Sequence, residues 1–148
     1  MSENFPLQRL LDLAHERTDD AARRLGELIG AEQEDDRKLT LLQQYRDEYQ
    51  ARFMDAARAG IGPDAWRNFS AFIARLDEAI EQQQRIVAES HDRMVAGQQA
   101  WIAERNRMKA IDALSQRHDK QQARKEARRD QHLTDEHAAK LGRNRKDG

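Results

Sequence analysis

Histidines are the residues of this sequence best suited to bind a metal ion or to carry a proton near neutral pH. Only two of the five, His132 and His137, lie close together in the chain. A spacing of five residues places two side chains on different faces of a helix, whereas a spacing of four would align them. The absence of cysteine also excludes thiolate ligands, cysteine nucleophiles and disulfides. We therefore predict no metal site and interpret the histidines as solvated side chains. The other three are His15, His91 and His118.

The glycines and carboxylates form no catalytic or cofactor-binding pattern either. Gly60 and Gly62 lie close together, but no lysine followed by serine or threonine comes after them, so they are not a phosphate-binding loop. Asp and Glu are abundant, yet a catalytic carboxylate needs a dry, concave pocket that shifts its pKa. Two long helices packed only on each other, the fold that the chain's heptad repeat predicts, leave no such pocket. We therefore predict that the protein is not an enzyme and binds no cofactor.

The chain as a whole is strongly polar. Of the 148 residues, 36% are charged and 38% are hydrophobic, and the mean hydropathy is -1.05. Such a chain is either disordered or folded around a narrow apolar strip. Long stretches rich in Ala, Leu, Glu, Gln, Arg and Lys favour helices. One cluster of helix-breaking residues, Gly60 to Pro63, interrupts them. We predict helices over about 4–59 and 63–140, joined by a turn over about 60–63.

Both predicted helices carry the seven-residue repeat of a coiled coil, with apolar residues at positions a and d. We call the a and d positions of both helices the seam. Starting the heptads of the second helix at Trp66 gives these a positions: Trp66, Ile73, Ile80, Val87, Met94, Trp101 and Met108. Starting those of the first helix at Leu11 gives these d positions: Ala14, Ala21, Leu28, Asp35, Leu42, Tyr49 and Ala56.

The two seams complement each other when the chain folds back at Ile61. Residues equally distant from Ile61 then face each other, and small side chains meet large ones: Ala56 faces Trp66, and Ala21 faces Trp101. We therefore predict an all-α fold, in which two long helices form an antiparallel coiled-coil hairpin. We expect one domain over residues 1–148 and a protein that is monomeric on its own.

The same register leaves the end of the second helix without a partner. Residues 120–148 overhang the first helix and form an unpaired basic segment. Residues 101–148 hold 13 of the 26 Lys and Arg residues but only 8 of the 27 Asp and Glu residues. The segment is either a solubilising tail or an arm that docks on an acidic partner. We predict no nucleic-acid binding, because carboxylates are interspersed and no aromatic residue offers base stacking.

More apolar residues lie near the turn than a two-helix seam requires. Tyr45 on the first helix occupies a flanking g position, as do Phe72, Ala79 and Ile86 on the second. With the edges of three seam residues they could form an exposed stripe, which often marks a partner site. Alternatively, the two helices share a wider contact face. The three seam residues are Leu42, Tyr49 and Leu76.

The sequence also bears on localisation. No apolar run approaches the length of roughly 18 residues that a membrane span needs. Gln8, Arg9 and Asp12 interrupt any signal-peptide core within residues 1–13. We therefore expect a cytoplasmic protein.

The sequence resembles the flagellar export protein FliJ family over nearly its whole length. The most specific block covers residues 39–82, around the turn. The residues that carry the resemblance there are Leu39, Leu42, Tyr45, Tyr49, Gly60, Ile61, Trp66, Asn68, Phe69, Phe72, Ile73, Leu76, Ala79, Ile80 and Gln82. Further matches occur near the N-terminus, in residues 7–14 and 19–27, and at Asp135 and Glu136. The sequence departs from the family at Lys38 and Gln83.

The resemblance implies a component of the flagellar type III protein export apparatus, similar in shape to the gamma subunit of rotary ATP synthases. Its implied partners are the hexameric flagellar export ATPase, the cytoplasmic domain of the membrane export gate, and export chaperones. It would associate peripherally with the cytoplasmic face of the inner membrane. The resemblance places the gate-binding surface near the turn, and the ATPase-docking residues on the terminal half and the basic overhang. The implied gate-binding residues are Leu42, Tyr45, Tyr49, Phe72, Leu76 and Ala79.

The sequence is also compatible with three other functions. A coiled-coil scaffold or a holdase-like chaperone would have the same periodicity, although a plain scaffold needs no basic overhang. The corresponding stalk of a virulence type III secretion system would have the same physical role.

Overall fold

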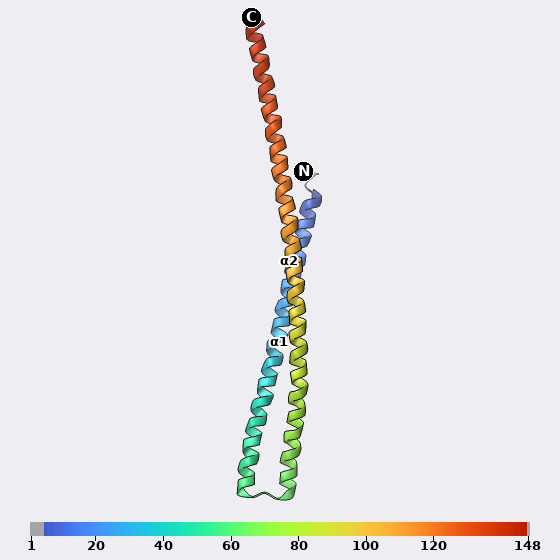
Figure 1. Cartoon of the computed structure of the whole chain (residues 1–148), viewed down its shortest axis with the longest axis vertical. Helices are drawn as coiled ribbons and strands as arrows, with labels where there is room; N and C mark the ends of the chain where they lie inside the picture. Colours follow the sequence, from blue (N-terminus) through green and yellow to red (C-terminus); the bar gives the residue numbers. More distant parts are fainter. Residues whose placement is uncertain (1–4, 148) are drawn as a thin grey trace. The chain divides into compact units, whose positions relative to one another are not determined.

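A computed structural model describes residues 5–147, which form two long helices: α1 over Phe5–Ala59 and α2 over Pro63–Asp147. The described residues contain no strand. The predicted all-α antiparallel hairpin is confirmed (Figure 1). Residue 4 of the expected first helix and Gly148 of the expected overhang lie outside the described residues. α2 continues beyond residue 140, the expected end, because Ala138 to Leu141 favour a helix and no proline follows.

The turn between the helices is short and has a clear local cause. Gly60 has a φ of 92°, in the left-handed region that glycine tolerates, and its amide donates to the carbonyl of Ala57 at 3.2 Å. Pro63 begins α2, where its missing amide hydrogen is not needed. The amide of Trp66 donates to the carbonyl of Gly62 at 3.0 Å and closes the first turn of α2. The chain therefore reverses direction within Gly60 to Gly62.

The helices divide into two compact units. One comprises residues 19–103 and the other residues 1–18 with 104–148. The expectation of one domain over 1–148 stays a prediction. In the unit of residues 19–103, the part of α1 before the turn and the part of α2 after it lie side by side (Figure 1).

Contacts across the unit of residues 19–103 follow the predicted register. The ring centroid of Tyr49 lies 4.3 Å from that of Phe72, next to the expected partner position 73. Gly97 packs against the side chain of Leu28 so closely that an added Cβ would lie 2.5 Å from Leu28 Cδ1. Among the seam residues of this unit, only Trp66 is exposed; the rest are half-buried or buried. Trp66 is 51% exposed because it lies in the first turn of α2, at the end of the helix pair.

In the other unit, the N-terminal part of α1 packs on α2 through Leu11 and Ala14, which are both buried. On α2, half-buried residues continue at seam spacing to His118 and Gln122. Every described side chain from residue 123 to 145 is exposed. The end of α2 thus runs past the N-terminus of α1 within this unit (Figure 1).

Candidate partner-binding surfaces

Six aromatic residues form a continuous line of ring contacts across the two helices beside the turn. Tyr49 is its centre, with ring centroids 4.3 Å from Phe72 and 5.4 Å from Phe69. Phe53 lies 5.4 Å from Phe69 and 4.8 Å from Trp66, and Tyr45 lies 6.4 Å from Phe72. Tilted and edge-on ring pairs of this kind contribute about 0.5–1.5 kcal/mol each beyond their buried area. We call this group the aromatic ladder: Tyr45, Tyr49, Phe53, Trp66, Phe69 and Phe72.

The structure gives the six residues implied by the resemblance different degrees of exposure. Tyr45 is 53% exposed, although its ring packs against Phe72. Leu76 is buried at 8% exposure and belongs to the core. Leu42, Tyr49, Phe72 and Ala79 are half-buried. The apolar stripe is therefore partly a wide contact face between the helices, with Tyr45 as its most exposed member.

A shallow hollow of about 330 Å³ lies next to Leu42. Its lining is mainly apolar, and Lys38, Leu41, Leu42 and Gln83 form it. Leu41 is 59% exposed, more than any of the six implied residues. An exposed leucine beside a hollow offers a partner both an apolar contact and a place to insert a side chain. We call Leu41, Leu42, Tyr45 and Phe72 the turn-proximal surface.

Sequence reasoning overlooked Leu41, Met54 and the exposure of Trp66. Leu41 precedes Leu42, and two adjacent leucines in a helix point about 100° apart, so both cannot lie in one seam. That adjacency was the signal available in the sequence. Met54 follows the seam residue Phe53 in the same way and is also exposed.

Farther from the turn, polar side chains interrupt the seam and pair with each other. Asp35 accepts a hydrogen bond from the hydroxyl of Ser90, and its backbone carbonyl accepts one from the amide of Gln83 at 3.0 Å. Ser90 and Gln83 are both buried. Because buried polar groups must be hydrogen-bonded, these contacts hold the helices in one register.

His91 and Glu32 form an ion pair beside this polar layer. Nδ1 of His91 lies 2.8 Å from Oε1 of Glu32 on the other helix. The hydrogen bond to Glu32, followed by the attraction of its charge, raises the pKa of His91 above its ordinary value. Closer to the turn, Nε of Arg46 donates to Asp77 at 2.6 Å, and this hydrogen bond raises the pKa of Arg46. Both pairs link α1 to α2.

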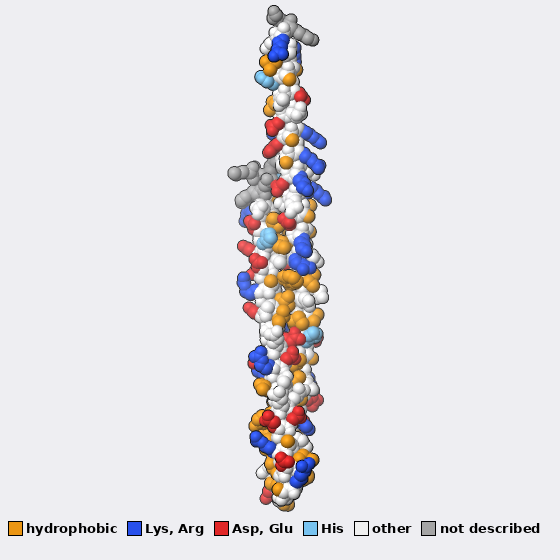
Figure 2. Space-filling view, turned by 90° about the vertical axis from the view of Figure 1, so that its left-hand side faces the viewer, with side chains coloured by type: hydrophobic (Ala, Val, Ile, Leu, Met, Phe, Trp, Pro, Cys, Tyr) orange, Lys and Arg blue, Asp and Glu red, His pale blue; other side chains and the backbone are white. Residues whose placement is uncertain are grey.

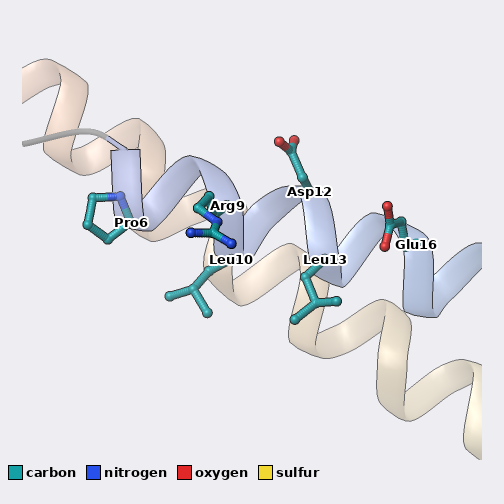
Figure 3. A pocket seen from close by; sticks show the side chains of 6 residues that line it. All are labelled: Pro6, Arg9, Leu10, Asp12, Leu13 and Glu16. Atoms are coloured by element: carbon teal, nitrogen blue, oxygen red, sulfur yellow. The ribbon is translucent and has the colours of Figure 1, made fainter. Parts of the chain in front are cut away.

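A second apolar surface lies on the N-terminal part of α1. Leu10 and Leu13 are 51% and 42% exposed and, with their neighbours, line a shallow hollow of about 510 Å³. Figure 3 shows the two leucines directed to one side of the helix, while Asp12 points away from them. The full lining is Pro6, Arg9, Leu10, Asp12, Leu13 and Glu16.

The part of the chain that the structure describes offers no metal centre, since no three His, Asp or Glu side chains gather there. Neither helix, over its described length, holds a segment apolar enough to span a lipid bilayer.

Comparisons with known proteins find similar sequences along nearly the whole chain. The family model described as "Flagellar FliJ protein" matches residues 2–147. A protein of Salmonella typhi named "Flagellar FliJ protein" is 31% identical over 138 residues, which cover 93% of this chain and 94% of the relative. A protein of the same name from Escherichia coli strain K12 matches with the same identity and coverage.

Proposed function

Since the chain belongs to the flagellar FliJ protein family, we propose that it acts as a stalk and adaptor in export. Family membership makes it a component of flagellar protein export. In the proposed role it binds the hexameric export ATPase at one part of the molecule and the cytoplasmic domain of the export gate at another. It also contacts export chaperones. It works by binding, not by chemistry, on the cytoplasmic face of the inner membrane.

The observation that carries the proposal for the gate is the turn-proximal surface. Tyr45 and Leu41 are both more than half exposed; Leu41 lines the hollow, and Tyr45 is the most exposed tyrosine of the aromatic ladder. Apolar and aromatic side chains held by packing lose little conformational entropy on binding, which favours them as interface anchors. The surface includes three of the residues that the resemblance implies for gate binding: Leu42, Tyr45 and Phe72.

Binding of the purified chain to the cytoplasmic domain of the export gate, measured by calorimetry, tests this site. We expect Leu41→Ala with Tyr45→Ala to weaken binding by about tenfold or more, because loss of an interface anchor costs 1–2 kcal/mol or more. Val95→Ala is the matched control, since Val95 is also exposed but lies elsewhere on α2. Equal affinities for the two variants would refute the assignment of this surface.

The ATPase part of the proposal rests on the unit that contains the exposed end of α2. The measurement is the rate of ATP hydrolysis by the export ATPase of the same organism, with and without the chain, together with the size of the ATPase assembly. Stimulation with ring assembly supports the stalk. If there is neither stimulation nor co-sedimentation, a scaffold or holdase role replaces it.

A further inference from the structure

Two exposed leucines near the start of α1, Leu10 and Leu13, form an apolar ridge that the hairpin leaves uncovered. We call them the leucine ridge. Leu10 is 51% exposed and Leu13 is 42% exposed, and both lie outside the seam. We propose that a second copy of this chain docks on the leucine ridge, so that two molecules associate about a two-fold axis. This inference goes beyond the proposed function and does not depend on it.

Two shallow hollows flank the leucine ridge, and its two leucines line both of them. The first, of about 510 Å³, lies on α1 and includes the acidic residue Glu16 (Figure 3). The second, of about 230 Å³, reaches α2 and includes Arg17 and Arg107. The rest of its lining is apolar and consists of Ala14, Ile111 and the leucine ridge. The ridge therefore has a carboxylate on one side and two guanidinium groups on the other.

The charges beside the ridge lack partners within the hairpin. Among residues 5–147, the side chains of Glu16, Arg17 and Arg107 form no ion pair. Three or four residues before and after Glu16 stand only Asp and Leu, so no cation lies within its reach along α1. Arg17 and Arg107 bring like charges to one hollow from two helices, whereas the two ion pairs between α1 and α2 described above join opposite charges. The second hollow thus needs a carboxylate from outside.

A second copy can supply that carboxylate. Arg17 directly follows Glu16 in the sequence and lines the same hollow as Arg107, so Glu16 and Arg107 lie at about the same height along the helix pair. A two-fold axis parallel to the helices keeps each residue at its height and exchanges the two sides of the ridge. Glu16 of each copy then faces the hollow between Arg17 and Arg107 of the other, and the two leucine ridges pack against each other.

The opposite orientation of the two copies fits less well. An axis perpendicular to the helices would reverse the heights, and Glu16 would then lie near Leu114, which is seven residues or about 10 Å beyond Arg107 along α2. Leu114 is 54% exposed and offers a carboxylate no hydrogen bond. In the parallel orientation Leu114 instead adds apolar surface to the contact, because it occupies the same heptad position as Arg107.

The mixture of charges favours a second copy over a lipid surface or a nucleic acid. Both of these are polyanions, which Arg17 and Arg107 would attract but Glu16, beside the same ridge, would repel. Figure 2 shows acidic and basic side chains interspersed along the described chain. A second copy presents both signs in the required arrangement, since each molecule offers the charge that the other lacks.

The sequence predicted a monomer because the hairpin satisfies its own seam. The leucine ridge lies outside that seam, so the heptad pattern takes no account of it. A contact of this size belongs to the interfaces below about 1,200 Å², which hold weak and transient complexes. We therefore expect a dimer that dissociates on dilution.

Sedimentation equilibrium of the full-length chain over a wide range of concentrations measures this association. The key variants are Glu16→Arg, Arg107→Glu and the combination of the two, which exchanges the charges and again sets opposite signs across the axis. Asp12→Arg is the matched control, because Asp12 is an exposed acid on the same helix that points away from the leucine ridge (Figure 3). Circular dichroism checks that every variant keeps the helical content of wild type.

We expect the effect of Arg107→Glu to change sign with the residue at position 16. Glu16→Arg should weaken dimerisation by about tenfold or more, because it sets a cation against two arginines. Arg107→Glu should weaken the wild-type dimer by about threefold, yet strengthen that of Glu16→Arg by about threefold, since the two sites contact each other. Leu10→Ala with Leu13→Ala should abolish the dimer, and Asp12→Arg should change its dissociation constant by less than about threefold.

Four results would overturn the proposal. The first is a wild-type chain that stays monomeric at every concentration, whether or not it binds phosphatidylglycerol vesicles or another protein. The second is equal weakening by Asp12→Arg and Glu16→Arg, which would mean that net charge controls the association. The third is a loss of affinity on Arg107→Glu in both backgrounds, which would exclude the contact with Glu16. The fourth is a dimer that the two leucine substitutions leave unchanged.

Discussion

The rings of Tyr49 and Phe72 lie 4.3 Å apart across α1 and α2, the shortest ring separation in the aromatic ladder. Tyr49 also contacts Phe69, so one side chain of α1 is held by two of α2. Tyr45, one helical turn away, contacts Phe72 from the edge of the ladder and is largely exposed. Two tyrosines on the same face of α1 therefore differ in packing: Tyr49 is held between two rings, and Tyr45 contacts one ring and is largely exposed.

Alanine substitutions should separate a contribution to stability, expected of Tyr49, from a contribution to binding, expected of Tyr45. Tyr49→Ala should lower the free energy of unfolding by about 2 kcal/mol or more, because it leaves a cavity between two rings. Tyr45→Ala should lower it by less than about 1 kcal/mol, yet weaken binding to the export gate more than Tyr49→Ala does at temperatures where both are folded. Urea denaturation followed by circular dichroism, with calorimetric titration of the gate domain, measures both quantities. Equal losses of stability would show that both rings belong to the core.

The ion pair of His91 with Glu32 should make stability depend on pH. The pKa of His91 is raised in the folded protein, so the folded state binds a proton more tightly than the unfolded state. Its contribution is then fully present below about pH 6.5, the unfolded value, and is lost as the pH rises through the higher folded pKa.

Unfolding curves of wild type and His91→Gln at several pH values check this expectation. The stability advantage of wild type should shrink as the pH rises from 6 to 8. An advantage that stays constant or grows over that interval would contradict the ion pair. Glu32→Gln serves as the partner control and should remove the same pH dependence.

Three glycines within the helices provide a test of packing. An added Cβ at Gly26 or Gly30 would meet nothing within 4 Å, whereas at Gly97 it would lie 2.5 Å from Leu28 Cδ1. Gly26→Ala and Gly30→Ala should each stabilise the protein by up to about 1 kcal/mol, because alanine favours the helix more. Gly97→Ala should give no such gain, since Leu28 must move. The melting temperatures of the three variants test this expectation. A gain in melting temperature for Gly97→Ala equal to that for Gly26→Ala would refute the close packing of Gly97 against Leu28.

Removal of the exposed end of α2 should leave the rest intact. Every described side chain from 123 to 145 is exposed, so a chain ending at Gln122 loses little buried apolar surface. We expect its melting temperature to change by no more than a few degrees. Its helical signal per molecule should fall in proportion to the residues removed. A large fall in melting temperature would mean that this segment packs on the remainder of the protein.

Periodicity alone predicted most of the fold. A coiled coil repeats one contact along its length, so the heptads starting at Leu11 and Trp66 specified the faces of both helices, and the break at Gly60 specified their antiparallel pairing. The exposure of Trp66 was missed because the heptad pattern does not record where a helix pair ends. The helix beyond residue 140 was missed because its residues lack a seam and because Gly142 is unfavourable within a helix.

The candidate site was harder to predict. Sequence spacing placed Tyr45 and Phe72 on flanking positions, but exposure depends on how far each side chain reaches across its neighbour. Phe72 is half-buried and its ring contacts Tyr49, while Leu41, at a position outside the seam, is more exposed than Tyr45 or Phe72. These differences come from side-chain packing in three dimensions, which a repeat pattern does not contain.

The three-residue turn also bears on the order in which the helices assemble. Contacts near it join residues close in sequence, such as Phe53 and Trp66, whereas His91 and Glu32 are 59 residues apart. Each contact, once made, shortens the loop that the next one must close, so the entropy lost at each step stays small. We expect the unit of residues 19–103 to fold as a zipper that starts at Gly60 to Gly62. In stopped-flow refolding, substitutions at Phe53 should slow folding, whereas those at Leu28 should mainly speed unfolding.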